Sequence, residues 1–202
     1  MIQTSQRMRG RPREFDTDAA IESAMDVFWS SGYYATSLPE LLEATNLSRG
    51  SVYAAFGDKR GLFLRALDRY IAEALTRLDT ALDPQKDALA GLRACLAEYV
   101  ERTSGVAGKR GCLVVKTTME LVSHDTEVEQ RIRRFFKTME TRLTAALKRA
   151  KSEGRLADGV EPATAARLLL RLLVGMRVVS KTSSDRSASQ AIVQTLLDRF
   201  VK

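Results

Sequence analysis

Hydrophobic residues recur every three or four positions along most of this chain, which is the spacing of helices that bury one face. No segment shows a competing strand pattern. The first helix follows the basic arm "MIQTSQRMRGRPREFD" and has Ile21, Ala24 and Phe28 on one side. Asp16 is positioned to cap its start, and Gly32 is positioned to end it.

The next two helices are short and are separated by a tight turn. Ser37 and Glu40 have the spacing of a capping box, and Pro39 is tolerated in the first turn of a helix. Asn46 can adopt the left-handed conformation that the turn needs, and Ser48 is the N-cap of the third helix, "RGSVYAAF". Each of these helices is predicted to have about two turns.

Six further helices follow at the same spacing. Asp58 is expected to cap the fourth, which ends near Asp83, and Asp83 and Pro84 are expected to open the fifth. The segment "SGVAGKRG" is predicted to be a flexible loop. The last four helices are predicted over 112–122, 125–152, 162–181 and from Ser184 or Asp185 onward. About nine helices and no strand place the chain in the all-α class.

Composition restricts the possible locations of the protein. The chain has 202 residues, 45% of them hydrophobic, so it can bury a full core. Its longest apolar runs, such as "AARLLLRLLVGMRVV", contain arginine and are too short to cross a bilayer. The N-terminus lacks the apolar segment of a secretory signal, and two cysteines make no disulfide framework. We therefore expect a cytoplasmic protein with no membrane partner.

The residues that catalysis would need are scarce. One histidine and two cysteines exclude the usual zinc sites, and the sequence has neither a glycine-rich phosphate loop nor a nucleophile elbow. We expect no metal, no cofactor and no enzymatic activity.

Net charge alone does not indicate a nucleic-acid partner. The formal charge is +7, but residues 61–202 hold 25 Lys and Arg against 17 Asp and Glu, whereas residues 1–60 hold 7 against 8. Within those first 60 residues, the basic side chains are confined to the N-terminal arm and to the segment from Arg49 to Arg60. This local placement, rather than the total, favours a directed contact with nucleic acid.

Two short helices with a tight turn, braced by the first helix, form a helix-turn-helix unit. In its second short helix, Val52, Ala55 and Phe56 share one side and are expected to pack against the first two helices. The opposite side carries Arg49, Gly50, Ser51, Tyr53 and Ala54. Small residues let the backbone approach base pairs, arginine can donate to guanine edges, and hydroxyl groups can reach phosphates.

The amino ends of helices two, three and four offer free backbone N–H groups to phosphate oxygens. The candidate DNA-binding residues at these ends are Thr36, Ser37, Ser48 and Lys59. A helical adaptor or dimerisation protein that never meets DNA is the alternative, and it would leave Arg49, Ser51 and Tyr53 exposed without a role.

The stretch "GYYATSLPELLEATNLSRGSVYAAFGDKRGLF" resembles the DNA-binding domain of the tetracycline-repressor (TetR) family of bacterial regulators. The resemblance covers helices one to four, and Asn46 stands where family members usually have glycine. It implies a homodimer on a palindromic, double-stranded operator, with Tyr53 and Lys59 on phosphates and Arg49 on a base. The expected organisation is a basic arm over 1–14, a three-helix DNA-binding domain over 15–60, and a larger effector-sensing and dimerisation domain over 61–202.

Two further parts of the chain have alternative interpretations. Arg11 and Arg13 of the arm can lie in an A·T-rich minor groove, or the arm can be a solvated tail. The last two helices are more apolar than one buried face requires, so we expect a dimer contact along both, with an ordinary core contact as the alternative.

Cys112 follows Lys109, Arg110 and Gly111 at the start of a helix, where cations and the helix dipole favour a thiolate. Its segment, "GKRGCLVVKTTMEL", resembles that of TetR-type regulators that respond to electrophiles through a cysteine. Cys112 is therefore a candidate sensor, with a buried, inert thiol as the alternative.

Polar residues on the same helix are candidates for lining an effector cavity or for facing water. They are Lys116, Thr117 and Glu120. The functional prediction is a one-component regulator, expected to be a repressor, that a small-molecule or electrophilic effector releases from DNA.

Overall fold

The computed structural model describes residues 15–202, and within that range it is all-α. Ten helices form, and the only strand-like feature in the described range is a single bridge between Leu156 and Val201. The helix beyond the nine expected is α6, Gly105–Arg110, which lies in the segment predicted to be a loop. The loop prediction was wrong because Gly108 packs under α9, where its carbonyl accepts a hydrogen bond from Ser180.

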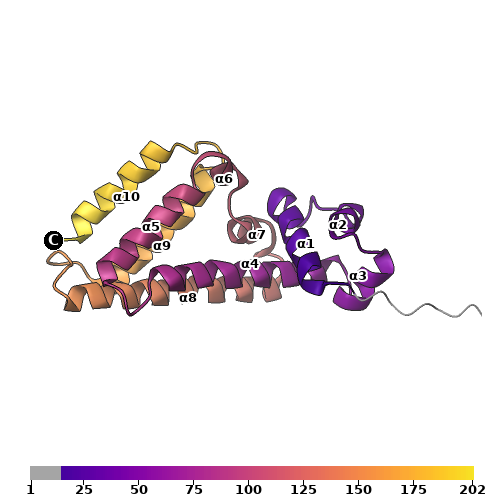
Figure 1. Cartoon of the computed structure of the whole chain (residues 1–202), viewed down its shortest axis with the longest axis horizontal. Helices are drawn as coiled ribbons and strands as arrows, with labels where there is room; N and C mark the ends of the chain where they lie inside the picture. The colour runs from indigo at the N-terminus through magenta and orange to yellow at the C-terminus, as the bar shows by residue number, and fades with distance from the viewer. Residues whose placement is uncertain (1–14) are drawn as a thin grey trace, which may run out of the picture.

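Three helices form a small bundle at one end of the molecule (Figure 1). They are α1, Thr17–Ser31; α2, Leu38–Thr45; and α3, Arg49–Phe56. The predicted caps at Asp16 and Ser48 are present, as are the capping box at the start of α2 and the left-handed Asn46, with φ of 52°. Fully buried Phe28, Leu41 and Val52 make the core of this bundle.

Helix α4, Lys59–Ala81, connects the small bundle to the rest of the molecule (Figure 1). At 1.5 Å per residue its 23 residues extend about 34 Å. It packs against α1 and α3 of the small bundle and against α5, α7 and α8 of the larger part. Ion pairs with α8 and its cap occur along the length of α4, from Arg60 to Asp79. Helix α4 is therefore one continuous element that contacts both parts of the molecule.

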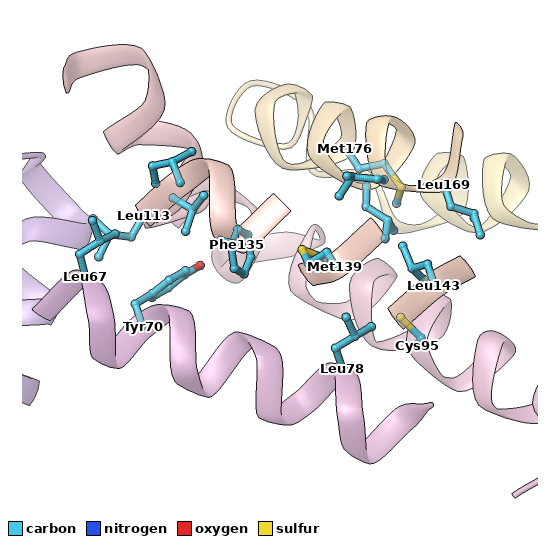
Figure 2. Close-up of a cluster of buried hydrophobic side chains, with 14 of the residues drawn as sticks. Leu67, Tyr70, Leu78, Cys95, Leu113, Phe135, Met139, Leu143, Leu169 and Met176 are labelled. Atoms are coloured by element: carbon cyan, nitrogen blue, oxygen red, sulfur yellow. The ribbon is translucent and has the colours of Figure 1, made fainter. Parts of the chain in front are cut away.

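The larger part consists of the remaining helices around an apolar core that includes Leu78, Met139 and Leu169 (Figure 2). Their bounds are Ala88–Arg102 for α5, Leu113–Leu121 for α7, Thr126–Ser152 for α8, Pro162–Val179 for α9 and Arg186–Phe200 for α10. Asp185 caps α10, as one of the two expected starts. No helix in the described range is long and apolar enough to span a membrane.

The start of the fifth helix differs from the prediction. Helix α5 begins at Ala88 after an Asp87 cap, and Asp83 and Pro84 lie in the preceding turn. Arg149 of α8 donates hydrogen bonds to the carbonyl groups of both residues, at 3.4 Å and 2.7 Å. These carbonyls are held in the turn by a distant side chain that local sequence cannot indicate.

Candidate nucleic-acid interface

Helix α3 presents an outward surface with few large side chains. Arg49, Gly50 and Ala54 are exposed, and Tyr53 is 50% exposed. Val52 is fully buried, as expected. Ala55 is exposed, so the expectation that it packs inward was wrong. The inner side of α3 is formed by Val52 and the half-buried Phe56.

The caps of α2, α3 and α4 use some backbone donors and leave others open. Ser48 Oγ accepts from Ser51 N–H at 3.1 Å, and the two hydroxyl groups lie 2.9 Å apart. Ser37 and Glu40 bond each other reciprocally, and Asp58 accepts from Gly61 N–H at 2.7 Å. The first N–H groups of α3 and α4 have no acceptor among the described residues, so they remain available to an anion.

Thr36 does not lie where a phosphate contact needs it. Its side chain is 1% exposed, and its hydroxyl donates to the Gly32 carbonyl at 2.5 Å. The residue ties the α1–α2 turn together instead of facing outward. Nearby Tyr34, which sequence reasoning did not single out, is 62% exposed and is available on the outer surface.

The two basic residues that open α4 have different roles. Lys59 lies with its ammonium 4.5 Å from the ring centroid of Tyr33, and burial lowers the pKa of Lys59 while Glu120 and Glu40 oppose this shift. Arg60 turns the other way and binds two carboxylates of α8. Its bonds run to Asp125 at 2.9 Å and 3.0 Å and to Glu127 at 2.8 Å. Arg60 is thus held by carboxylates at the start of α8, whereas Lys59 forms no ion pair among the described residues.

A set of polar contacts joins the end of α1 to the segment 110–120, and we call it the α1–α7 clasp. Arg110 pairs with Asp26 at 2.5 Å and lies 3.8 Å over the ring of Trp29. The indole N–H of Trp29 donates to the carbonyl of Gly111 at 3.2 Å. These contacts fix the start of α7 on the third and fourth turns of α1.

Lys116 and Glu120 complete the α1–α7 clasp further along α7. Lys116 donates to the carbonyls of Trp29 and Ser30, at 2.9 Å and 2.6 Å, where α1 ends. Glu120 accepts from the backbone N–H of Tyr33 at 2.7 Å. Both residues were candidates for lining an effector cavity, but in the structure they connect the larger part of the molecule to the DNA-binding bundle.

Thr117, the third candidate on this helix, is 1% exposed. Its hydroxyl is the one buried side-chain polar atom without a hydrogen-bond partner among residues 15–202.

Cys112 lies where α4 meets the clasp. It is half-buried, and the hydroxyl of Tyr70 on α4 donates to its Sγ at 3.4 Å. Tyr70 in turn packs edge-on against Trp29, with ring centroids 4.9 Å apart. Cys95 is buried, and burial followed by the charge of Glu98 raises its pKa to about 12. The two thiols thus have different environments.

Two predictions remain, on the basic arm and on metal binding. Arg11 and Arg13 lie outside the described residues. Between residues 15 and 202, no group of acidic, histidine and cysteine side chains is arranged to hold a metal ion.

Family comparisons account for both parts of the chain. Residues 20–66 match the model "Bacterial regulatory proteins, tetR family", and residues 88–196 match "Tetracyclin repressor-like, C-terminal domain". The chain belongs to the TetR family. This TetR-family protein is a DNA-binding transcriptional regulator, and its helix-turn-helix unit is the part that binds DNA.

Individual TetR-family relatives support the same assignment. The HTH-type transcriptional repressor ComR of Escherichia coli is 27% identical over 96% of this chain and 93% of its own length. The E. coli repressor BdcR is 32% identical over 67% of each chain. A cysteine mutant of the TetR-family regulator CifR, complexed with 26-base-pair operator DNA, has a TM-score of 0.81 and 33% identity, covering 95% of this chain and all of its own. These relatives are named as regulators and not as enzymes.

Proposed function

We propose that this regulator is a repressor that binds a palindromic operator as a homodimer and leaves it when an effector binds or when Cys112 is modified. In this proposal Arg49 contacts a base, and Tyr53 and Lys59 contact phosphates. The other proposed DNA contacts are Arg11, Arg13, Ser37, Ser48, Gly50 and Ser51. The open outward side of α3 supports the assignment, as do the ComR, BdcR and CifR relatives.

The proposed dimer uses the apolar surface of α9 and α10. Leu168 and Val179 of α9 are 50% and 58% exposed, and their spacing of eleven residues puts them on one side of the helix. Ile192 of α10 is 47% exposed. Large apolar side chains left open to water on the last two helices are typical of an isologous contact between identical subunits. The two DNA-binding bundles of such a dimer would contact major grooves about 34 Å apart.

The observation that carries the release mechanism is the position of Cys112 between α4 and the α1–α7 clasp. A group added to its sulfur would occupy the space of the Tyr70 hydroxyl and would push α4 away from α7. Helix α4 packs against the small bundle, and Trp29 of that bundle packs against Tyr70 of α4. The same displacement would therefore rotate the DNA-binding bundle. A coupling free energy of about 1–3 kcal/mol is enough for such release.

The test measures the fluorescence anisotropy of a labelled operator fragment, found by footprinting upstream of the regulator's own gene. Treatment with N-ethylmaleimide or hypochlorite is expected to release the DNA from the parent protein and from Cys95→Ser, but not from Cys112→Ser. Cys95→Ser is the matched control because it removes the other thiol. Release of Cys112→Ser at the parental reagent concentration would contradict thiol sensing and would leave a non-covalent effector as the signal.

A further inference from the structure

A small cavity lies beside Cys112, between α4, α5, α7, α8 and α9, with a volume of about 40 Å³. Its apolar wall includes Leu78, Phe135 and Met139, and the hydroxyl of Tyr70 points toward Phe135 (Figure 2). A water molecule needs about 10–15 Å³ by the same measure, so the cavity has room for only a few heavy atoms.

The polar part of the lining is strongly basic. Arg77 of α4, Arg102 of α5 and Arg177 of α9 converge on the cavity, and Glu98 is the one carboxylate among the residues that line it. The other titratable groups of the lining are Tyr70, Tyr99, Cys95 and Cys112, which are neutral in their protonated forms. Three guanidinium groups and one carboxylate give the lining a net charge of +2.

Glu98 does not satisfy the two guanidinium groups nearest to it. The same oxygen, Oε1, lies 3.6 Å from Arg77 Nε and 3.9 Å from Arg102, and neither distance is a hydrogen bond. Among the described residues, neither the Arg77 nor the Arg102 side chain donates a hydrogen bond, although Glu73 also lies 3.9 Å from Arg77. Burial, and after it the charge of Arg102, lowers the pKa of Arg77. Both guanidinium groups therefore retain unused donors at a basic cavity.

Arg177, the third arginine of the lining, is buried and held in a fixed position. It is 6% exposed, donates to the carbonyl of Arg102 at 2.7 Å, and lies 5.1 Å over the ring of Tyr99. A buried cation with one neutral acceptor is stabilised by any anion that enters beside it.

We infer that this cavity binds a small carboxylate, with the carboxylate group on Arg77 and Arg102 and a short carbon chain against Phe135 and Met139. A carboxylate matches the planar donor fork of arginine, and the apolar wall favours an alkyl group over a fully hydrated inorganic anion. The inference deepens the proposed function and rests on it, because it names the chemical class of the non-covalent effector. A ligand there contacts α4 and lies next to Cys112.

The experiment uses the full chain and pairs propionate with propionamide, which has the same number of heavy atoms but no charge. Thermal unfolding and saturation-transfer NMR are measured at constant ionic strength, with phosphate as a further probe. Propionate is expected to bind at millimolar concentration and to raise Tm, whereas propionamide and phosphate bind at least tenfold more weakly. Equal binding of propionate and propionamide, or tighter binding of phosphate, would overturn the inference.

Variants then locate the site. Arg102→Gln and Arg77→Gln are each expected to weaken propionate binding at least tenfold, and the second variant serves if the first fails to fold. Arg133→Gln on the exposed side of α8 is the control and is expected to bind like the parent. Cys112→Ser is expected to keep propionate binding, so failure of thiol sensing is distinguishable from failure of this site. If both arginine variants bound propionate with parental affinity, the proposed carboxylate site would be refuted.

Discussion

Gly32 is the point where the α1–α7 clasp meets the DNA-binding bundle, and replacing it with alanine has a calculable cost. Its φ of 89° and ψ of 178° lie in a region that is essentially restricted to glycine, so alanine there costs about 1–3 kcal/mol in backbone strain. The new Cβ would also lie 2.1 Å from Glu120 Oε1. Glu120 must then move and give up its bond to the N–H of Tyr33, which costs about 1–2 kcal/mol for a half-buried carboxylate.

The expected loss for Gly32→Ala is therefore about 2–5 kcal/mol of unfolding free energy, measured by urea denaturation. Gly57→Ala is the matched control, because Gly57 has φ of 81° but no atom within 4 Å of the added Cβ. It should lose only the strain component, about 1–3 kcal/mol. The affinity for operator DNA should also fall more in Gly32→Ala than in a variant that loses the same unfolding free energy at a position outside the α1–α7 clasp.

A double-mutant cycle with Glu120→Ala isolates the contact. Once the carboxylate is absent, Gly32→Ala should cost only the backbone strain, so the two substitutions should show a coupling of about 1–2 kcal/mol. Additivity within about 0.5 kcal/mol would refute the reasoning that Glu120 occupies the space next to Gly32.

Three other substitutions test separate contacts. Thr117→Val should raise the unfolding free energy by about 1 kcal/mol in thermal unfolding, because it removes a buried hydroxyl without a partner; destabilisation would mean that the hydroxyl is bonded. Lys116→Met should lower it by about 1–2 kcal/mol, because two carbonyls at the end of α1 lose a charged donor; an unchanged urea midpoint would contradict this. Arg60 holds the pKa values of Asp125 and Glu127 below their usual range, so its contact stabilises the protein above about pH 5 and is lost in acid. Arg60→Gln should therefore lose less stability than the parent between pH 5 and pH 3, and parallel pH profiles would argue against the ion pairs.

Local sequence was sufficient to predict much of the fold. The caps at Asp16, Ser48 and Asp58 and the turn at Asn46 depend on contacts within four residues, and each is present as predicted. The errors arose where distant residues decide the outcome. Arg149 of α8 holds the turn before α5, and no local pattern indicates that contact.

The candidate site was predicted to a similar extent. The open side of α3 follows from helical periodicity around the buried Val52. Thr36 was misjudged because its hydroxyl finds the Gly32 carbonyl within the same turn. Lys116 and Glu120 were singled out as polar residues on an apolar helix, but their partners at the end of α1 and just after it lie 86 to 87 residues away along the chain. Spacing cannot predict such pairs.

The most direct test of the account is the binding of labelled operator DNA by the parent and by Arg49→Ala combined with Tyr53→Phe, measured over a range of salt concentrations. Steep salt dependence is expected for the parent and loss of specific binding for the double variant, with the control Arg133→Ala binding like the parent. Circular dichroism should give the same helix content for all three proteins. Unchanged operator affinity in the folded double variant would contradict the central claim that the outward side of α3 contacts DNA.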